Sequence, residues 1–167
     1  MTRIVTHTTI LTAALVAGHA GFAQDDEVRT KQYDDGGIYE GTFKNGLQHG
    51  TGTYTLPNGY EYSGDEGGFL NAMHHGTGRM ESPNGYRYEG DWVRGVKEGS
   101  ATITYPDGAI YEGEVKRGAR EGEGKLTMPD GLIYEGMWKD GQIDGTGKLV
   151  QPNGDVYEGD LVAGQRE

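Results

Sequence analysis

The chain has 167 residues, of which 31 are glycine and only 34% are hydrophobic, and its net charge is −11. This composition excludes a compact core of aliphatic side chains, and the acidic charge disfavours nucleic acid and anionic lipid as partners. The absence of cysteine excludes disulfides, thiol nucleophiles and thiolate metal ligands.

The first segment, residues 1–23, has the features of a secretory signal peptide. Arg3 is followed by an apolar run that is strongest over Ile10–Gly18, and the small residues Gly21 and Ala23 end the segment. The alternative is a retained membrane anchor, but the run is shorter than the ~20 residues that a membrane-spanning helix needs. We therefore expect export, to the periplasm or outside the cell if the source is bacterial, with cleavage after Ala23.

A periodic pattern begins at residue 33. The motif Tyr-x-Gly returns at intervals of 23, 26, 23, 23 and 23 residues, and such a fixed period is the signature of a repeat architecture. The repeated tyrosines are Tyr39, Tyr62, Tyr88, Tyr111, Tyr134 and Tyr157. We expect a repeat array over residues 33–167, with units starting near these tyrosines and a partial unit from the last. An insertion at Glu66–Gly68 accounts for the long interval, and residues 24–32 are interpreted as a flexible N-terminal segment.

Each unit reads as a β-hairpin. In the first unit, "YEGTF" and "TGTYTL" alternate apolar and polar residues, as half-buried strands do, and the glycine-rich "KNGLQHG" lies between them. A Pro-Asn-Gly or Pro-Asp-Gly turn then leads into the next unit, and all five prolines of the chain lie in this one position of the repeat. Proline presets its φ angle and glycine takes the left-handed position, which predicts a three-residue hairpin loop.

The strand pattern separates two faces. Side chains two residues apart share a face, so Tyr39, Gly41 and Phe43 lie together and Glu40 lies opposite, among acidic residues expected to be solvated. The glycine leaves room for an aromatic ring to lie across the strand. Over all units the first face becomes an aromatic stripe, which we interpret as a candidate binding surface. The stripe comprises Tyr39, Phe43, Tyr62, Phe69, Tyr88, Trp92, Tyr111, Tyr134, Trp138 and Tyr157. A single layer does not cover such a stripe, so we expect a partner or a second copy to do so.

The repeat resembles the MORN (membrane occupation and recognition nexus) repeat. The segments "YEGDWVRGVKEGS" from Tyr88 and "YEGMWKDGQIDGTG" from Tyr134 carry the resemblance most clearly. It implies an all-β fold: an elongated, single-layer, twisted antiparallel sheet of repeated β-hairpins, with about 10–12 strands. It implies no catalytic residue.

No metal or cofactor is expected. His49 and His75 occupy the same position in successive units, and units stacked two strands apart would separate them by about 10 Å, too far to share an ion. The serines fall at scattered positions of the repeat, which does not indicate a nucleophile. The same spacing argument disfavours a calcium site on the acidic face.

Three functions remain as hypotheses. The first is a non-enzymatic, exported interaction or scaffold module that binds a protein partner, or itself as a homo-oligomer, through the aromatic stripe. The second is a binder of an envelope glycan or a membrane surface, since aromatic rows stack on sugar rings. The third is a regulatory companion of an enzyme.

Overall fold

The structure, a computed structural model, describes residues 27–166, and this part of the chain contains strands and turns but no helix. The strands are β1 Arg29–Gln32, β2 Ile38–Lys44, β3 Leu47–Thr55, β4 Glu61–Leu70, β5 Met73–His74, β6 Gly76–Glu81, β7 Arg87–Val93, β8 Val96–Thr104, β9 Ile110–Lys116, β10 Ala119–Thr127, β11 Ile133–Lys139, β12 Gln142–Val150, β13 Val156–Val162 and β14 Gln165–Arg166. The predicted signal peptide, residues 1–23, lies outside the described residues.

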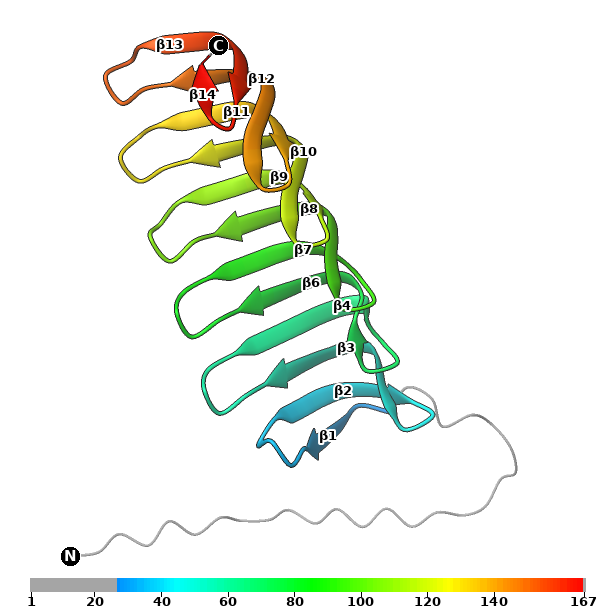
Figure 1. Cartoon of the computed structure of the whole chain (residues 1–167). Coiled ribbons are helices and arrows are strands. Elements are labelled where there is room, and N and C mark those ends of the chain that lie inside the picture. Colours follow the sequence, from blue (N-terminus) through cyan, green and yellow to red (C-terminus); the bar gives the residue numbers. More distant parts are fainter. Residues whose placement is uncertain (1–26, 167) are drawn as a thin grey trace, which may run out of the picture.

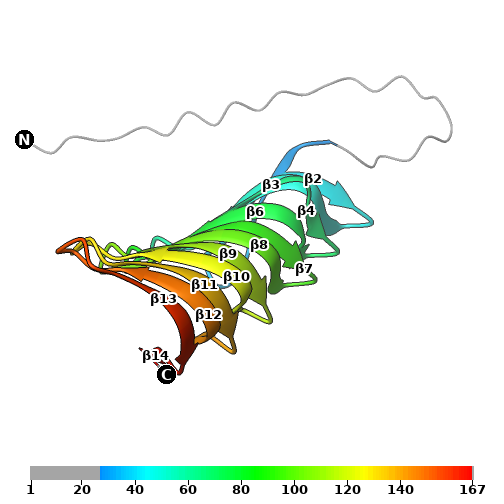
Figure 2. The same ribbon diagram turned by 90° about the horizontal axis from the view of Figure 1, so that it is seen from above.

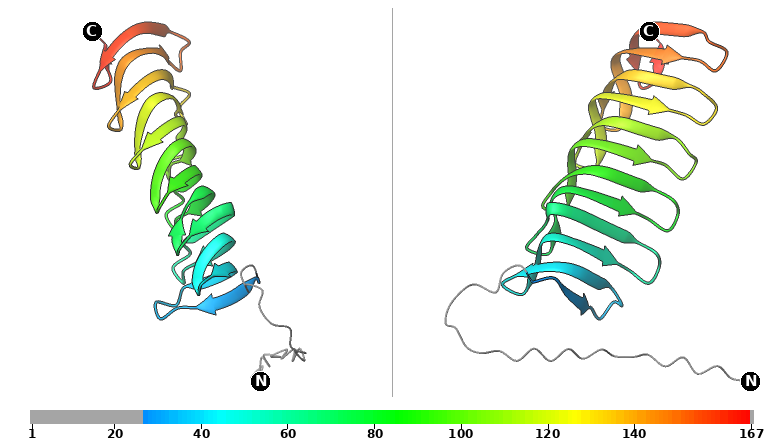
Figure 3. Two further views of the ribbon diagram at one scale, coloured as in Figure 1. Left: turned by 90° about the vertical axis from the view of Figure 1, so that its right-hand side faces the viewer. Right: turned by 180° about the vertical axis from the view of Figure 1, so that it is seen from behind.

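All fourteen strands belong to one sheet, and neighbouring strands follow the order of the sequence. Every pairing is antiparallel, and only the short β5 lies off the main path, where it pairs with β4. Figure 1 shows the hairpins stacked as a ladder, and in Figure 3 the first and last strands lie at opposite ends. The predicted fold class is confirmed. The strand number exceeds the expected 10–12 because β1, β5 and β14 have only four, two and two residues.

Two kinds of loop join the strands. In the Pro-Asn-Gly loop of the first unit, the Gly59 amide donates to the Leu56 carbonyl and the Leu56 amide donates to the Tyr60 carbonyl. Gly59 has a φ of 91°, as predicted from its place in a three-residue loop. At the other end of each hairpin, two residues of positive φ form the turn. An example is Arg94, with a φ of 49°, followed by Gly95, with a φ of 85°, a combination typical of the type I′ turn.

Each hairpin bends sharply part-way along its length. In β8 the bend is at Gly99, which has a φ of 98°, and residues 98–100 lie opposite the single residue Asp91 of β7. The extra residues form a bulge that curves the strands. Glycines of positive φ occupy the same position in the other units: Gly50, Gly76, Gly122 and Gly145. Seen from above, the hairpins are arched rather than flat, so the stack forms a long trough (Figure 2).

The bend divides each hairpin into a long arm, which ends at the Pro-containing loop, and a short arm, which ends at the type I′ turn. Short arms of successive units are joined by backbone hydrogen bonds. The Gly95 amide donates to the His74 carbonyl at 2.7 Å, and the Gly118 amide donates to the Lys97 carbonyl at 3.0 Å. The bend is therefore repeated in register along the ladder, which keeps the trough continuous.

The interpretation of residues 24–32 as a flexible segment was wrong for Arg29–Gln32. These residues form β1, which pairs with β2. All four are exposed, so no alternation of apolar and polar residues marks the strand. It forms because the turn from Tyr33 to Gly37 has the same hydrogen bonds as the Pro-containing loops, and because β2 offers an open edge there. The guanidinium of Arg29 also stacks on the Phe43 ring, 5.2 Å from its centroid.

The predicted insertion at Glu66–Gly68 lies at the bend of the second unit. It lengthens β4 to ten residues, and Gly67 takes a φ of 83°. The backbones of Gly64 and Gly68 then come so close that a Cβ on Gly64 would lie 2.7 Å from the Gly68 Cα. After the insertion Phe69 resumes the aromatic position of the repeat, opposite Gly50. The insertion is thus absorbed locally and leaves the next unit in register.

Candidate functional site

The predicted aromatic stripe is the core of the protein. Its members form one continuous cluster, and all of them except Tyr157, which is half-buried, are at most 6% exposed. The interpretation of these residues as an open binding surface is therefore wrong. The reason is the bend, because the short arm folds back over the aromatic face of the long arm. The stripe is covered by its own chain and needs no partner to cover it.

The repeated tyrosines are held by their own strands. The Tyr111 ring lies across Gly113 and Gly124, which face each other on β9 and β10, and a Cβ on either glycine would overlap it. The Tyr111 hydroxyl donates to the Glu114 carbonyl at 2.7 Å. Burial raises the pKa of the Tyr111 hydroxyl to about 12, so it stays protonated and acts as a donor at ordinary pH. The predicted role of the glycines as sites for rings is confirmed.

A second set of side chains lies on the short arms. It lies directly across from one Phe, Trp or Val residue of each unit, and we call these facing residues the aromatic column. We call the second set the inner column. Its members are Gln48, His74, Lys97, Arg120 and Ile143, which pair in register with Phe43, Phe69, Trp92, Val115 and Trp138 respectively. Over the five full units the inner column changes in character, from neutral polar through cationic to apolar, and in the closing partial unit the backbone register places Arg166 opposite Leu161. By contrast, the aromatic column and the row of repeated tyrosines remain apolar or aromatic in every unit.

His74 is enclosed by aromatic rings. Its imidazole stacks on Tyr62, with ring centroids 3.6 Å apart, and meets Trp92 edge-on at 5.0 Å. Burial lowers the pKa of His74 to about 4, and the nearby charge of Lys97 acts in the same direction. The imidazole is therefore neutral at physiological pH.

Lys97 reaches across the trough. Its ammonium lies 4.5 Å from the Tyr86 ring centroid, 4.8 Å from that of Tyr88 and 5.5 Å from that of Trp92. It also donates to the Tyr86 hydroxyl at 3.2 Å. Burial lowers the pKa of Lys97 to about 8, so the side chain is still mostly charged at neutral pH. Lys97 lies on the short arm and Tyr86 at the far end of the long arm, and the two side chains meet on the aromatic face. The two arms therefore bend towards that face, which is the concave one.

Arg120 occupies the same position one unit further on. Its guanidinium lies 4.1 Å from the Trp138 ring centroid and 5.9 Å from that of Tyr105, and it donates to the Gly141 carbonyl at 2.6 Å. Beside it is a cavity of about 410 Å³, lined by Arg120, Leu126, Trp138, Gly141, Gln142, Ile143, Ala163 and Gly164. This cavity combines an apolar floor with a single positive charge at one side.

Five half-buried tyrosines form the edge of the trough near the Pro-containing loops. We call them the rim tyrosines: Tyr33, Tyr54, Tyr60, Tyr86 and Tyr105. Tyr33 meets Tyr54 edge-on at 6.0 Å, and Tyr86 meets Tyr105 edge-on at 5.9 Å. The rim tyrosines and the inner column together line a groove along the concave side, which we call the concave groove.

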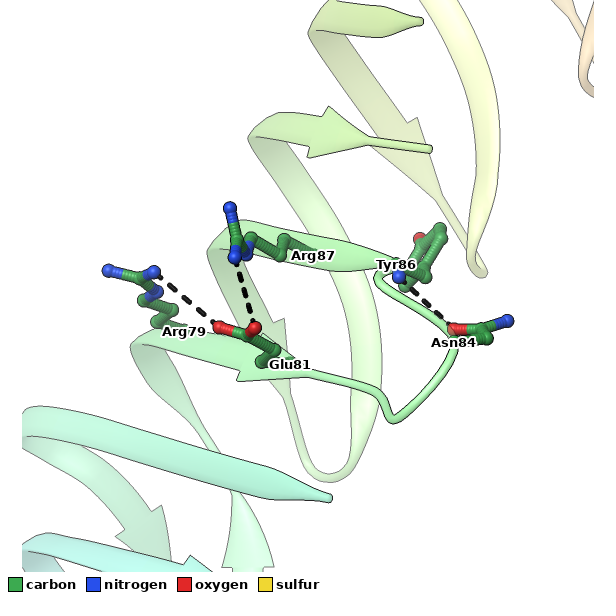
Figure 4. Close-up of polar contacts among 5 residues, drawn as sticks. All are labelled: Arg79, Glu81, Asn84, Tyr86 and Arg87. Carbon is green, nitrogen blue, oxygen red and sulfur yellow. Dashed lines mark hydrogen bonds and ion pairs between the residues drawn. The ribbon is translucent and has the colours of Figure 1, made fainter. Parts of the chain in front are cut away.

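The opposite, convex face carries charged side chains together with exposed apolar ones such as Ile110. Arg79 and Glu81 of β6 and Arg87 of β7 form a small ion-pair group there, with Glu81 3.1 Å from Arg87 and 3.7 Å from Arg79 (Figure 4). The hydrogen bond from Arg87 lowers the pKa of Glu81. Lys125 lies opposite Glu112 and Glu135. These surface contacts solubilise the sheet and contribute little to stability.

One of the two histidines considered as metal ligands, His75, has another role. The Nδ1 atom of His75 accepts a hydrogen bond from the Arg94 amide, and the carboxylate of Glu98, one unit later, accepts one from the Arg117 amide. In these two units this position of the repeat thus caps the type I′ turn of the following unit, whereas within residues 27–166 the buried Nδ1 atom of His49 has no hydrogen-bond partner. Among residues 27–166, no three His, Asp or Glu side chains lie close enough together to hold a metal ion.

Sequence reasoning missed the inner column and three of the rim tyrosines, Tyr33, Tyr60 and Tyr86. Alternation along the second strands of the hairpins places the other two, Tyr54 and Tyr105, on the aromatic face. The sequence does contain a pattern that indicates the inner column. The residue five positions after each Phe, Trp or Val of the aromatic column lies beyond the turn, on the same face of the sheet. It was overlooked because the segment between the two strands was interpreted only as a reversal, whereas it contains a bend and a short pair of strands.

Comparison with known families agrees with the repeat geometry. The family model of the MORN repeat matches residues 39–59, 66–85, 88–110, 111–133 and 134–156. The chain belongs to the MORN repeat family. The second match begins at residue 66, at the insertion inside the second unit. No family model of an enzyme matches this MORN-repeat chain.

Two solved structures share a low similarity with this MORN-repeat chain. The TCP domain of SAS-4 (dCPAP) from Drosophila melanogaster, in complex with a proline-rich motif of Ana2 (dSTIL), has 18% identity and a TM-score of 0.49, covering 79% of this chain and 71% of that one. The wild-type TCP10 domain of CPAP from Danio rerio has 15% identity and a TM-score of 0.26, covering 81% and 88%. Values this low assign no partner to the chain.

No curated protein sequence matches the chain. In the part of the chain that the structure describes, no helix is long and apolar enough to cross a membrane.

Proposed function

We propose that this MORN-repeat chain is a non-enzymatic interaction module that binds a protein partner along the concave groove. The observation that supports this proposal is the row of rim tyrosines. The repeat provides its own comparison, because other units place different residues at the same positions. Tyr105 corresponds to Ser82 and Gln151, and Tyr60 corresponds to Ala109. The fold therefore does not require tyrosine there.

Rim tyrosines suit a protein ligand. Tyrosine offers a large apolar ring with a polar end at a low cost in side-chain entropy, and it is enriched where proteins bind one another. The rings are half-buried, and four of them contact each other in two pairs, so the orientations of these four are fixed before a ligand arrives. A stacked repeat presents such groups on a rigid, extended concave surface.

Site-specific photo-cross-linking in the source cells tests this proposal. Replacing Tyr105 by p-benzoylphenylalanine places a photoreactive ring in the concave groove, and the same replacement of Glu112 places one on the convex face. We expect a discrete protein adduct from position 105 and none from position 112. Adducts to lipid or polysaccharide, or the same proteins from both positions, would contradict the proposal. An adduct of twice the chain mass would identify a second copy as the partner.

We also propose that the chain is exported, with residues 1–23 removed as a signal peptide. The basic start, short apolar run and small residues before Gln24 support this. Intact-mass measurement of the protein from the fractionated source cell is the test. We expect an envelope or extracellular protein beginning at Gln24, and a cytoplasmic protein that retains the segment would overturn the export proposal.

A further inference from the structure

Two cations of the inner column have no carboxylate partner. Within residues 27–166, neither Lys97 nor Arg120 forms an ion pair, although the chain has 26 acidic residues against 15 basic ones. The ion pairs that the structure shows involve Arg79, Arg87 and Lys116, and these lie elsewhere. A half-buried cation that lacks a counter-ion is costly to desolvate. The protein therefore holds positive charge in its groove while the rest of its surface is acidic.

The fold does not require these charges. The same position is Gln48 in the first unit, a neutral His74 in the second and Ile143 in the fifth, and all three fit the trough. Both cations also keep unused donors. Arg120 has five N–H groups and makes one hydrogen bond, to Gly141, while Lys97 has three and makes one, to Tyr86. Both side chains are thus available to an anionic group that enters the groove.

The spacing of the two cations defines the shape of the ligand. They occupy one position in successive units, and units are separated by two strand spacings, or about 9.6 Å. A chain in the polyproline II conformation advances ~3.1 Å per residue with three residues per turn, so every third side chain lies on one face about 9.3 Å from the last. A segment running along the trough would place side chains i and i+3 at Lys97 and Arg120.

Resting on the proposed function, we propose that the concave groove recognises an extended acidic segment of its partner protein. Two carboxylates three residues apart pair with Lys97 and Arg120, and an apolar side chain three residues beyond the second enters the 410 Å³ cavity beside Trp138. The Tyr86 and Tyr105 rings pack against the backbone between them. The carboxylates bind in the charged form, since Arg and Lys form their strongest hydrogen bonds with ionised oxygens.

An acidic segment fits this groove better than an anionic bilayer. Lys97 and Arg120 are half-buried on the concave side, beneath the rim tyrosines, while the outer surface of the chain is acidic. A membrane attracts basic residues that project from a surface. A narrow extended chain enters a trough that a flat bilayer does not.

The protein contains its own reporters for a binding experiment. Its only two tryptophans are Trp92 and Trp138, whose ring centroids lie 5.5 Å from the Lys97 ammonium and 4.1 Å from the Arg120 guanidinium. Tryptophan fluorescence of the mature chain is titrated with the peptide Ac-PEPPEPPLPP-NH2 and with its reversed sequence, because the direction of the ligand is open. In the control peptide both glutamates are replaced by glutamine.

Matched variants separate charge recognition from folding. Lys97→Gln and Arg120→Gln introduce the residue that already occupies this position as Gln48, and Lys148→Gln removes the same charge from the exposed convex face. We expect saturable binding of one glutamate peptide, weakened roughly tenfold or more by each groove substitution, as for loss of a charge-assisted hydrogen bond. We expect no change with Lys148→Gln, and weaker binding as salt rises.

Several outcomes would overturn the proposal. Equal binding of the glutamine peptide would show that charge is not recognised, and no binding of either glutamate peptide would reject the acidic segment. Phosphatidylserine vesicles or heparin that bind through Lys97 and Arg120 where the peptides do not would replace the protein ligand by a lipid or a polyanion. In each case a cross-link from position 105 to a protein would leave the proposed interaction function standing, so the two failures are distinguishable.

Discussion

The hydroxyl of Tyr88 donates to the backbone carbonyl of Asp91, 2.7 Å away in the same strand. Asp91 lies at the bulge, opposite three residues of β8, where the pairing of β7 with β8 is interrupted. The same bond, from a tyrosine to the carbonyl three residues later, recurs at Tyr39, Tyr111, Tyr134 and Tyr157. The repeated tyrosine therefore fills the core and also satisfies the backbone where the sheet bends.

Tyr88→Phe keeps the ring and removes this bond. We expect the free energy of unfolding to fall by about 1–2 kcal/mol, because a carbonyl at the bend loses its partner. Tyr105→Phe is the matched control, since within the described residues the Tyr105 hydroxyl has no hydrogen-bond partner, and its effect is expected to be small. Urea denaturation of both variants decides the point. Equal effects would show that the bond contributes nothing.

The two glycines beneath each tyrosine are not equivalent. At Gly113 a Cβ would lie 2.5 Å from the Gly124 Cα and 2.6 Å from the Glu123 carbonyl oxygen, which are backbone atoms. At Gly124 the three nearest atoms to a Cβ would all belong to the Tyr111 side chain, and the third unit already carries Ala101 in this position. We expect Gly113→Ala to destabilise the protein by more than about 2 kcal/mol and Gly124→Ala by clearly less. A larger loss for Gly124→Ala would contradict this reading.

One turn carries a residue that its conformation disfavours. Ala72 has a φ of 64° at the second position of a type I′ turn, where the other five turns have glycine. The left-handed conformation costs a residue with a Cβ about 1 kcal/mol or more. We expect Ala72→Gly to raise stability by about 0.5–1 kcal/mol. Ala119→Gly in the extended strand β10 serves as the control and is expected to lower stability by a similar amount. Thermal denaturation that shows Ala72→Gly to be destabilising would refute the prediction.

His74 predicts a specific pH dependence. Its pKa is about 4 in the folded protein against an ordinary 6.5. Between these values the unfolded chain binds a proton at this site and the folded chain does not, so the free energy of unfolding falls as the pH drops from 6.5 towards 4. The expected loss is on the order of 1–3 kcal/mol, reduced by the partial exposure of the ring.

The variant His74→Gln isolates this contribution from that of the carboxyl groups, which titrate nearby. The stability difference between wild type and variant, measured by urea denaturation, is expected to be more favourable to the wild type at pH 7 than at pH 4.5. The same difference at both pH values would show that folding does not lower the pKa of the imidazole.

Lys97→Gln is expected to fold as well as the wild type. At pH 7 the variant no longer desolvates an ammonium group, which offsets the loss of contacts with three aromatic rings. The free energy of unfolding should therefore change by less than about 1 kcal/mol. Chemical denaturation provides the measurement, and a loss above about 2 kcal/mol would make Lys97 a structural residue instead of a ligand-binding one.

Much of this fold follows from the sequence, because its determinants are local and repeated. The 23-residue period gives the hairpins, the proline position gives one loop, and Gly113 lies under Tyr111 as period-2 alternation predicts. The bend does not follow from the pattern. It depends on one left-handed glycine in each second strand, such as Gly99, and a glycine among so many does not reveal its φ angle. The error over the aromatic stripe came from this single omission.

The strand β1 was missed for a different reason. Its residues, Arg29–Gln32, have no apolar member, so burial does not select their pairing. They pair because the edge of β2 is available beside them. A strand that depends on its neighbour in this way carries no pattern of its own for sequence reasoning to find.

The bend at Gly99 and its equivalents is set inside each unit, by one backbone conformation. The cross-section of the trough is therefore independent of the number of units. Duplication or loss of one 23-residue unit would change the length of the trough by about 9.6 Å and leave its width as it is. The number of units therefore sets the length of ligand that the trough can hold, while the inner column sets the charges that the ligand must carry, and evolution is free to alter one while keeping the other.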